Sequence, residues 1–313
     1  MLHLRRRLSV AVDNGCADLR QHSATQLVKA TIFMPMRMLN SLRKHHPTQR
    51  QREVSRSEVF DHYVVSMPTQ QNAVDLVEGW NCAFPPEFGV AGGELAAYQD
   101  PRIGWMLEKY GSTEHRSVLE LGPLEGGHTV MMERSGAAQI DAIEANSLAY
   151  LRCLITKEIF GLTRSHFWLG DFVKWMENSE KRYDLVIASG VLYHSNDPLH
   201  LLELIARRTD SAFIWTHFVD DVAMPADDPR RQVISREPQI QHFRGIPIRT
   251  YKRTYLNAQQ HAKFCGGPTD EHRWLNRDDM LAALRAVGFT DISVAHEEPD
   301  HQFGPAMSIF ATK

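Results

Sequence analysis

The sequence is poor in the residues that hold metals or form disulfides. Its four cysteines, Cys16, Cys82, Cys153 and Cys265, lie far apart without CxxC or Cys/His ligand spacing, which predicts reduced thiols, no metal site and no disulfide framework. No apolar run approaches the ~20 residues that span a bilayer. The run LSVAV near the N-terminus is shorter than the about 7–15 apolar residues of a secretory signal. We therefore expect a cytoplasmic protein without a membrane span.

The chain also lacks a strong excess of charge. With 35 Lys and Arg against 38 Asp and Glu, its formal net charge is −3, which gives no global attraction to nucleic acid or to an anionic membrane. Positive charge gathers in residues 1–56, where eleven Lys and Arg face three acids. Apolar residues in 26–43 have near-helical spacing. We expect a short amphipathic helix there that packs on the main domain, and an arm that contacts RNA is the alternative.

A regular alternation of apolar runs and helix-like segments begins after residue 116. The apolar runs predict strands at Val118–Leu121, Ile140–Glu144, His166–Leu169, Leu185–Ser189 and Ala212–Thr216. The segments between them predict helices at Thr129–Ser135, Ser147–Phe160, Phe172–Asn178 and Pro198–Arg207. A helix at Arg277–Val287 and two strands, Asp291–His296 and Ala306–Ala311, follow. Such an alternation indicates an α/β fold with a parallel sheet and right-handed crossovers.

Two segments do not follow this alternation. Residues 78–105 are rich in aromatics, proline and glycine, which suits either a segment that closes over a ligand or an irregular packing layer. A long insert, about 219–274, carries basic residues and tyrosines, among them Arg230, Arg231, Arg236, Arg244, Arg249, Lys252, Arg253, Tyr251 and Tyr255. These could engage an anionic small molecule, a sugar or a nucleic-acid backbone, although most are expected to form a solvated surface.

The turn after the first predicted strand carries the strongest functional signal. It reads ELGPLEGG from Glu120 to Gly127, and glycines there let the backbone approach a ligand at the N-terminus of the next helix. Glu144 ends the second strand, 144 − 122 = 22 positions after Gly122, the spacing of an acid that accepts hydrogen bonds from ribose hydroxyls. A dinucleotide is disfavoured because GxGxxG is missing and Glu125 would face phosphates. The turn therefore predicts an adenosine-containing cofactor without a pyrophosphate.

With these residues, the chain from about 80 to 313 resembles the class I S-adenosylmethionine-dependent methyltransferases. The resemblance implies a Rossmann-like, doubly wound, seven-stranded sheet in the order 3-2-1-4-5-7-6, preceded by a helical N-terminal extension over 1–79. It also implies a cofactor site, in which Glu120 and Gly122 hold the methionine part and Glu144 holds the ribose. Asp171 and Phe172 would hold the adenine, and Gly126 and Ser189 complete the predicted contacts with S-adenosylmethionine.

The segment SGVLYH, from Ser189 to His194, ends the fourth predicted strand beside the expected methyl group. A histidine with an ordinary pKa of about 6.5 can accept a proton from a hydroxyl acceptor near neutral pH. We predict His194 as the base or orienting group, with Tyr193 beside it. The alternative is that His194 caps the following turn, and His217 after the fifth strand is a second candidate base.

SGVLYH is also similar to the corresponding segment of the enzymes that carboxymethylate the tRNA wobble uridine, in which Tyr193 would match a cofactor-contacting tyrosine. The lysine expected to meet their donor's extra carboxylate has no counterpart in residues 81–86. We therefore predict methyl transfer to an oxygen or nitrogen of a small molecule or saccharide-like metabolite. tRNA modification is the alternative reaction, and a cofactor-binding partner protein without catalysis is an alternative of another class. The sequence carries no signal for an oligomeric state.

Overall fold

The computed structural model describes residues 63–256, 258 and 264–313. The helix predicted over 26–43 and the basic residues of 1–56 lie outside this part of the chain. The described residues belong to one compact unit, Tyr63–Lys313. It begins with a short helix, α1 (Gln70–Leu76), which contacts α4 (Ser147–Phe160). The boundary predicted between residues 79 and 80 stays a prediction.

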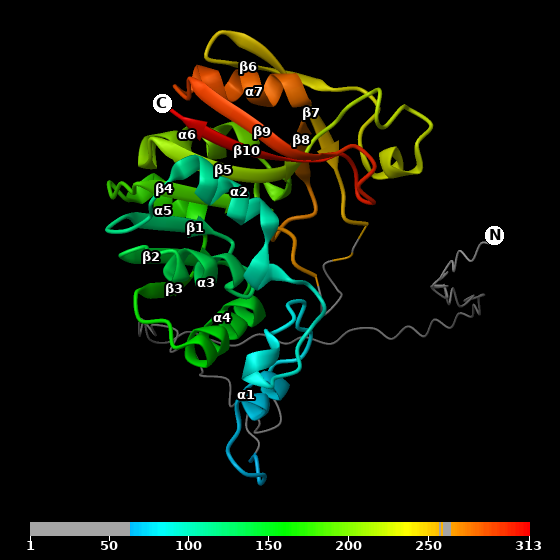
Figure 1. The fold of residues 1–313 in the computed structure, drawn as a ribbon. Coiled ribbons are helices and arrows are strands. Elements are labelled where there is room, and N and C mark those ends of the chain that lie inside the picture. Colours follow the sequence, from blue (N-terminus) through cyan, green and yellow to red (C-terminus); the bar gives the residue numbers. More distant parts are fainter. Residues whose placement is uncertain (1–62, 257, 259–263) are drawn as a thin grey trace, which may run out of the picture. The chain divides into compact units, whose positions relative to one another are not determined.

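A seven-stranded sheet forms the centre of this unit (Figure 1). Its strands are β1 (Ser117–Leu121), β2 (Gln139–Glu144), β3 (Ser165–Leu169), β4 (Leu185–Ser189), β5 (Ser211–His217), β9 (Asp291–Glu298) and β10 (Ala306–Thr312). Their spatial order is β3-β2-β1-β4-β5-β10-β9. The first five are parallel, and β10 runs antiparallel to β5 and β9. Because β6 to β8 form a separate sheet, this order equals the predicted 3-2-1-4-5-7-6 once those three strands are left out, which confirms the fold.

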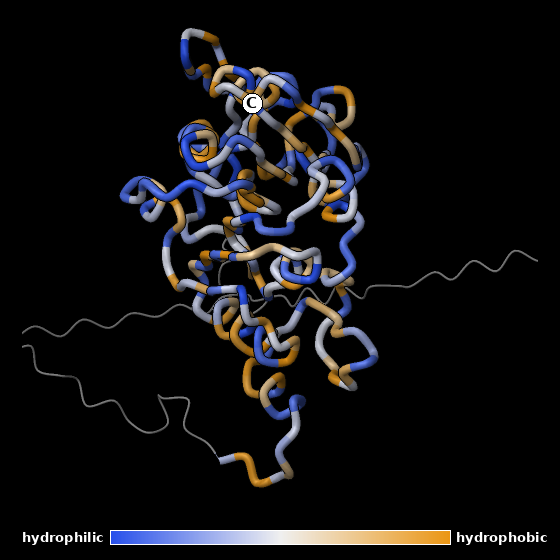
Figure 2. The backbone as a smooth tube through the Cα atoms, turned by 60° about the vertical axis from the view of Figure 1, so that its left-hand side comes forward, coloured by the Kyte–Doolittle hydropathy of each residue, from blue (hydrophilic) through white to orange (hydrophobic). Residues whose placement is uncertain are grey.

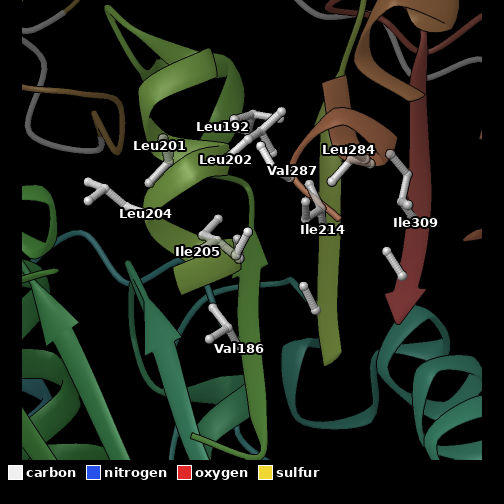
Figure 3. Close-up of a cluster of buried hydrophobic side chains, with 14 of the residues drawn as sticks. Val186, Leu192, Leu201, Leu202, Leu204, Ile205, Ile214, Leu284, Val287 and Ile309 are labelled. Atoms are coloured by element: carbon white, nitrogen blue, oxygen red, sulfur yellow. The ribbon is translucent and has the colours of Figure 1, made fainter. Parts of the chain in front are cut away.

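Helices cover both faces of the sheet because successive side chains of each strand point to opposite sides. On one face, apolar residues of the strands pack against α5 (Phe172–Asn178), α6 (Pro198–Arg208) and α7 (Arg277–Ala286). Figure 3 shows Leu202 and Ile205 of α6 above Val186 of β4, with Ile214 of β5 beside them. The other face is covered by α2 (Pro101–Tyr110), α3 (Gly127–Arg134) and α4. The layers make a doubly wound sheet whose loops meet at the carboxyl ends of β1 to β5.

The aromatic segment before the sheet belongs to the core. Trp80, Phe84 and Tyr98 are buried and pack with Cys153 and Ile159 of α4. Of the two interpretations of residues 78–105, the irregular packing layer is the one that fits these three aromatic side chains. The last five residues of the segment, 101–105, form the first half of α2, a helix that the apolar pattern does not separate from the loop.

The insert contains a small sheet of its own that the sequence did not predict. Its strands are β6 (Gln239–Phe243), β7 (Ile246–Arg253) and β8 (His272–Leu275), all antiparallel. The β6–β7 turn uses Arg244 and Gly245, with φ of 49° and 86°, the left-handed values that a two-residue hairpin loop requires. The strand β8 contacts α6 and the short 3₁₀ turn η4 (Leu192–His194) after β4. The insert thus lies against the carboxyl end of β4.

In Figure 2, the apolar residues of the described part of the chain occur in short stretches along the backbone. Within the described part of the chain, no helix has the length and apolar character that crossing a membrane requires.

Candidate functional site

The turn between β1 and α3 is held by positive backbone angles. Gly122 has φ of 63°, and a Cβ at this position would lie 2.7 Å from Cγ1 of Val191. Gly126, the N-cap of α3, has φ of 78°. Both positions favour glycine. Leu124 also has a positive φ, 57°, so this turn takes a left-handed conformation even where a side chain is present.

Glu144 lies at the end of β2 and is bonded to the same turn. Its Oε2 accepts from the backbone N–H of Leu124 at 3.1 Å, and its Oε1 accepts from that of Asn146 at 2.8 Å. Burial raises the pKa of Glu144, while these backbone donors act in the opposite direction. The carboxylate therefore joins the β1–α3 and β2–α4 loops at the carboxyl edge of the sheet.

Glu120 is buried within β1, with 2% of its surface exposed. Its Oε2 accepts from the hydroxyl of Thr129 on α3. Burial raises the pKa of Glu120, and the charge of Glu120 adds to the rise at Glu144. The two acids thus lie close enough for their negative charges to interact, and a cationic ligand at this turn would relieve that repulsion.

The sequence predicts that Glu125 faces the ligand, and this prediction is wrong. It is fully buried and accepts from the backbone N–H groups of Asn81 and Cys82, both at 2.8 Å. The Nη1 of Arg152 lies 3.6 Å from it. Glu125 anchors the aromatic segment to the turn, so the missing GxGxxG alone disfavours a dinucleotide.

Asp171 is the N-cap of α5, directly after β3. Its Oδ1 accepts from the backbone N–H of Val173 at 2.8 Å, and its Oδ2 accepts no hydrogen bond from the described residues. The N–H of Gly170 donates to the carbonyl of Glu144 at 2.8 Å, which places Asp171 next to the end of β2. Phe172 is half-buried and packs against the core beneath α5. The free oxygen of Asp171 is available to an external donor.

Ser189 ends β4, and η4 follows it with Tyr193 and His194. Tyr193 carries its ring close to His217 at the end of β5, with 4.6 Å between the ring centres and an angle of 77° between the planes. Its carbonyl accepts from the indole Nε1 of Trp274 on β8 at 3.1 Å. Burial raises the pKa of Tyr193, which keeps its hydroxyl protonated. The insert thus holds η4 against the sheet.

His194 is oriented by Tyr255. The hydroxyl of Tyr255 accepts from the N–H of Gly267 at 3.1 Å and lies 2.5 Å from Nδ1 of His194. The N–H of Gly267 can only donate, so among the described residues Nδ1 of His194 is the one acceptor within reach of the hydroxyl proton; donation to Nδ1 leaves the proton of the neutral imidazole on Nε2. Burial lowers the pKa of His194 to about 3. This geometry makes His194 a hydrogen-bond donor through Nε2.

His217 has the opposite tautomer. Its Nδ1 lies 2.8 Å from the carbonyl oxygen of Gly304, and since a carbonyl only accepts, Nδ1 carries the proton and Nε2 keeps its lone pair. Burial lowers the pKa of His217 to about 4. The ring of His217 stacks on Trp274 at 5.1 Å with 7° between the planes. At neutral pH, His217 is therefore an uncharged base with a free lone pair.

The structure brings the predicted site residues together in two groups. Glu120, Gly122, Gly126 and Glu144 meet at the β1–α3 turn, and Tyr193 meets His194 and His217 at the ends of β4 and β5. Gly122 connects the groups through its close approach to Val191. Sequence reasoning missed His272 and Trp274 of β8 and did not single out Arg253 among the basic residues of the insert. In the described part of the chain, no cluster of His, Cys, Asp and Glu is arranged to hold a metal ion.

Comparison with known proteins relates this chain to others through its fold. No protein-family model and no curated protein matches the sequence. The crystal structure of the N-terminal domain of EvdMO1, in the presence of SAH and D-fucose, aligns with a TM-score of 0.57 and 24% identity, over 78% of this chain and 94% of that one. The same domain with SAH bound gives the same values. The structure of EvdMO1 itself aligns with a TM-score of 0.51 and 20% identity, over 78% of this chain and 46% of that one. This likeness and the strand order establish the Rossmann-like fold of the class I methyltransferases.

Proposed function

We propose that this protein is an S-adenosylmethionine-dependent methyltransferase that acts on a small, sugar-like molecule. The observation that carries the proposal is the hydrogen bond from Leu124 to Glu144, which sets an acid beside a glycine turn at the carboxyl edge of the sheet. Ligands bind at this edge in open α/β sheets. The EvdMO1 domain, which has the same fold, was crystallised with SAH and D-fucose, and this supports both the cofactor and a sugar-like acceptor.

The residues at the turn fit the proposed cofactor. Glu144 would hold the ribose hydroxyls, Asp171 the adenine amino group through its free Oδ2, and Gly122 leaves the backbone open for the methionine part, with Gly126, Ser189 and Phe172 lining the rest. The negative charge of Glu120 and Glu144 suits a cationic ligand. When bound, S-adenosylmethionine supplies an electrophilic methyl group carried on a sulfonium.

The protein's own chemical task is to align the acceptor and to remove its proton. We assign the proton transfer to His217, because its Nε2 has a free lone pair while the Nδ1 of His194 is occupied by Tyr255. His217 Nε2 takes the hydroxyl or amine proton of the acceptor, and Nδ1–H stays bound to the carbonyl of Gly304. His194, through Nε2–H, and Tyr193 orient the acceptor. The described part of the insert contacts this side through the hydrogen bond from Trp274 to Tyr193, and closing a site over the acceptor would exclude water.

tRNA modification receives less support from the described residues. A tRNA-binding surface needs Lys and Arg free to meet phosphates, and most basic side chains of the insert are bound to carboxylates, for example Arg249 to Asp279 at 2.7 Å and Arg244 to Glu203 at 2.8 Å. Salt-dependent binding of tRNA to the full chain would favour this alternative. A cofactor-binding partner without catalysis would bind S-adenosylmethionine and transfer no labelled methyl group to any acceptor.

Calorimetry with the full-length protein tests the cofactor. We expect S-adenosylhomocysteine to bind and NAD not to bind, and binding of NAD alone would overturn the proposal. Glu144→Ala removes two backbone contacts and the ribose acceptors, so the affinity should fall by about tenfold or more, because a hydrogen bond to a charged group contributes about 1.5–3 kcal/mol. Glu158→Ala, on the exposed part of α4, is the matched control. An unchanged affinity in Glu144→Ala would show that the ribose assignment is wrong.

A further inference from the structure

The basic side chains of the insert differ in whether they have a carboxylate partner. Six of the described ones form ion pairs: Arg230 with Asp228, Arg231 with Asp221, Arg244 with Glu203, Arg249 with Asp279, and both Lys252 and Arg273 with Glu271. Among the described residues, no acid pairs with Arg236 or Arg253. Arg236 is exposed to solvent, whereas Arg253 is half-buried. Among the described basic residues of the insert, Arg253 is therefore the one that is partly buried and has no acidic partner.

The neighbours of Arg253 fix the position of its guanidinium but leave one of its hydrogen-bond donors unpaired. Its guanidinium lies 4.9 Å from the ring centre of Trp274, a cation–π distance. Its Nη1 donates to Nε2 of His272 at 3.1 Å, and His272 in turn donates from Nδ1 to the carbonyl of Asp270 at 2.9 Å. The Nε of Arg253 is buried and has no hydrogen-bond partner among the described residues. Burial lowers the pKa of Arg253, which reflects the cost of an uncompensated buried charge.

Arg253 belongs to the wall of the acceptor side. Trp274, on which it lies, stacks on His217 and donates to the carbonyl of Tyr193. The positive charge of Arg253 is one of the causes that lower the pKa values of His194 and His217, so the guanidinium is within electrostatic reach of both histidines. The strands β7 and β8 pair with each other, and their register sets Arg253 opposite His272. In the described part of the chain, a second buried donor without a hydrogen-bond partner is the Nε1 of Trp215 on β5, the ring of which lies 5.2 Å from that of His217.

We propose that Arg253 binds an anionic group of the methyl acceptor, a carboxylate or a phosphate carried on a small hydroxylated molecule. The inference rests on the proposed methyltransferase function and specifies its substrate class. A planar anion can accept two parallel hydrogen bonds from Nε and an Nη of the guanidinium. Such a contact would supply the missing partner of Nε and neutralise the charge. It would also fix the distance between the anion and the hydroxyl that faces His217.

Binding of matched neutral and anionic molecules to the S-adenosylhomocysteine complex tests the inference. Suitable pairs for calorimetry are D-fucose with D-galacturonate and D-galactose with D-galactose 6-phosphate. We expect at least one anionic member to bind about 10- to 100-fold more tightly than its neutral counterpart, the factor of one charge-assisted contact, and the preference to shrink as salt is added. Arg253→Gln should abolish the preference and leave S-adenosylhomocysteine binding unchanged. Arg236→Gln, an unpaired but exposed arginine of the same insert, should keep both.

Each other outcome is decisive. If no anionic member binds more tightly than its neutral counterpart to the wild-type complex, the inference is wrong, whether or not Arg253→Gln folds. If Arg253→Gln keeps the preference, another cation is responsible. The tRNA carboxymethylating enzymes use carboxy-S-adenosylmethionine as their donor. If Arg253→Gln loses affinity for this molecule, and the wild type shows no preference for anionic acceptors, then Arg253 binds the carboxylate of the donor. Failure of S-adenosylhomocysteine to bind the wild type would overturn the proposed function itself, which separates the two results.

Discussion

His194 and His217 differ in which ring nitrogen carries the proton, and this difference assigns their chemistry. The proton of His217 is held on Nδ1 by a backbone carbonyl, while the proton of His194 is directed to Nε2 by Tyr255. The sequence could predict a histidine beside the methyl group, but it could not tell a donor from a base. Tautomers depend on Gly304 and Gly267, which the chain brings close only after folding.

At this scale we predict that His217→Asn abolishes methyl transfer while S-adenosylhomocysteine binds as before. The asparagine keeps a polar side chain and loses the basic nitrogen, so the rate should fall by about 10²–10⁴-fold. Since the pKa of His217 is lowered to about 4, the wild-type rate should be flat above about pH 6 and decline only as the pH falls through about 4. His242→Ala, an exposed histidine of β6, is the control for both assays. A rate that titrates near pH 6.5, or an active His217→Asn, would contradict the assignment.

The β1–α3 turn and η4 are two elements that meet at a single glycine. The strands, the helices and Glu144 could be predicted because they depend on local periodicity and on a fixed spacing along the chain. The meeting of Gly122 with Val191 depends on how β1 and β4 pair. Likewise β6 has no buried residue, so it lacks the buried apolar alternation that marks a strand.

A double-mutant comparison tests the contact between these elements. Gly122 and Gly161 have nearly equal φ, 63° and 64°, but a Cβ at Gly161 would meet nothing within 4 Å. Gly161→Ala should cost about 1 kcal/mol of unfolding free energy, from the backbone angle alone. Gly122→Ala should cost about 1–3 kcal/mol more through its overlap with Val191, and should weaken S-adenosylhomocysteine binding.

Adding Val191→Ala to Gly122→Ala should restore most of this difference, because the methyl group that clashes is removed. Urea denaturation gives the stabilities, and calorimetry gives the affinities. Equal losses of unfolding free energy in Gly122→Ala and Gly161→Ala would mean that the β1–α3 turn and η4 are not in close contact at Gly122.

For the whole molecule, the buried histidines make stability depend on pH. Burial lowers the pKa values of His194, His217 and His272 to about 3, 4 and 4, whereas in the unfolded chain they titrate near 6.5. Between pH 6.5 and about 4, the unfolded state therefore binds protons that the folded state does not. The stability from these groups is fully present above pH 6.5 and is lost as the pH falls toward 4.

We expect the free energy of unfolding to decrease on acidification through this window. Each such histidine contributes a slope of at most about 1.4 kcal/mol per pH unit. Urea denaturation at several pH values should give a shallower slope for His217→Asn and an unchanged slope for His242→Ala. If the slope of His217→Asn equals that of the wild type, His217 takes up protons in the folded protein as readily as in the unfolded chain, and burial does not lower its pKa.

The insert leaves the main fold and returns to it at neighbouring residues. The N–H of Val219 donates to the carbonyl of Leu275 at 2.9 Å, and Val219 is bridged to Asn276, the N-cap of α7. A different segment could be spliced between these two points without moving β5 or α7, and the cost of closing a loop changes only slowly with its length. The replacement would need apolar residues where Ile248 and Leu275 enter the core. If the insert binds the acceptor as proposed, it is thus an exchangeable cassette, and new substrates can be acquired by recombination without any change to the glycine turn.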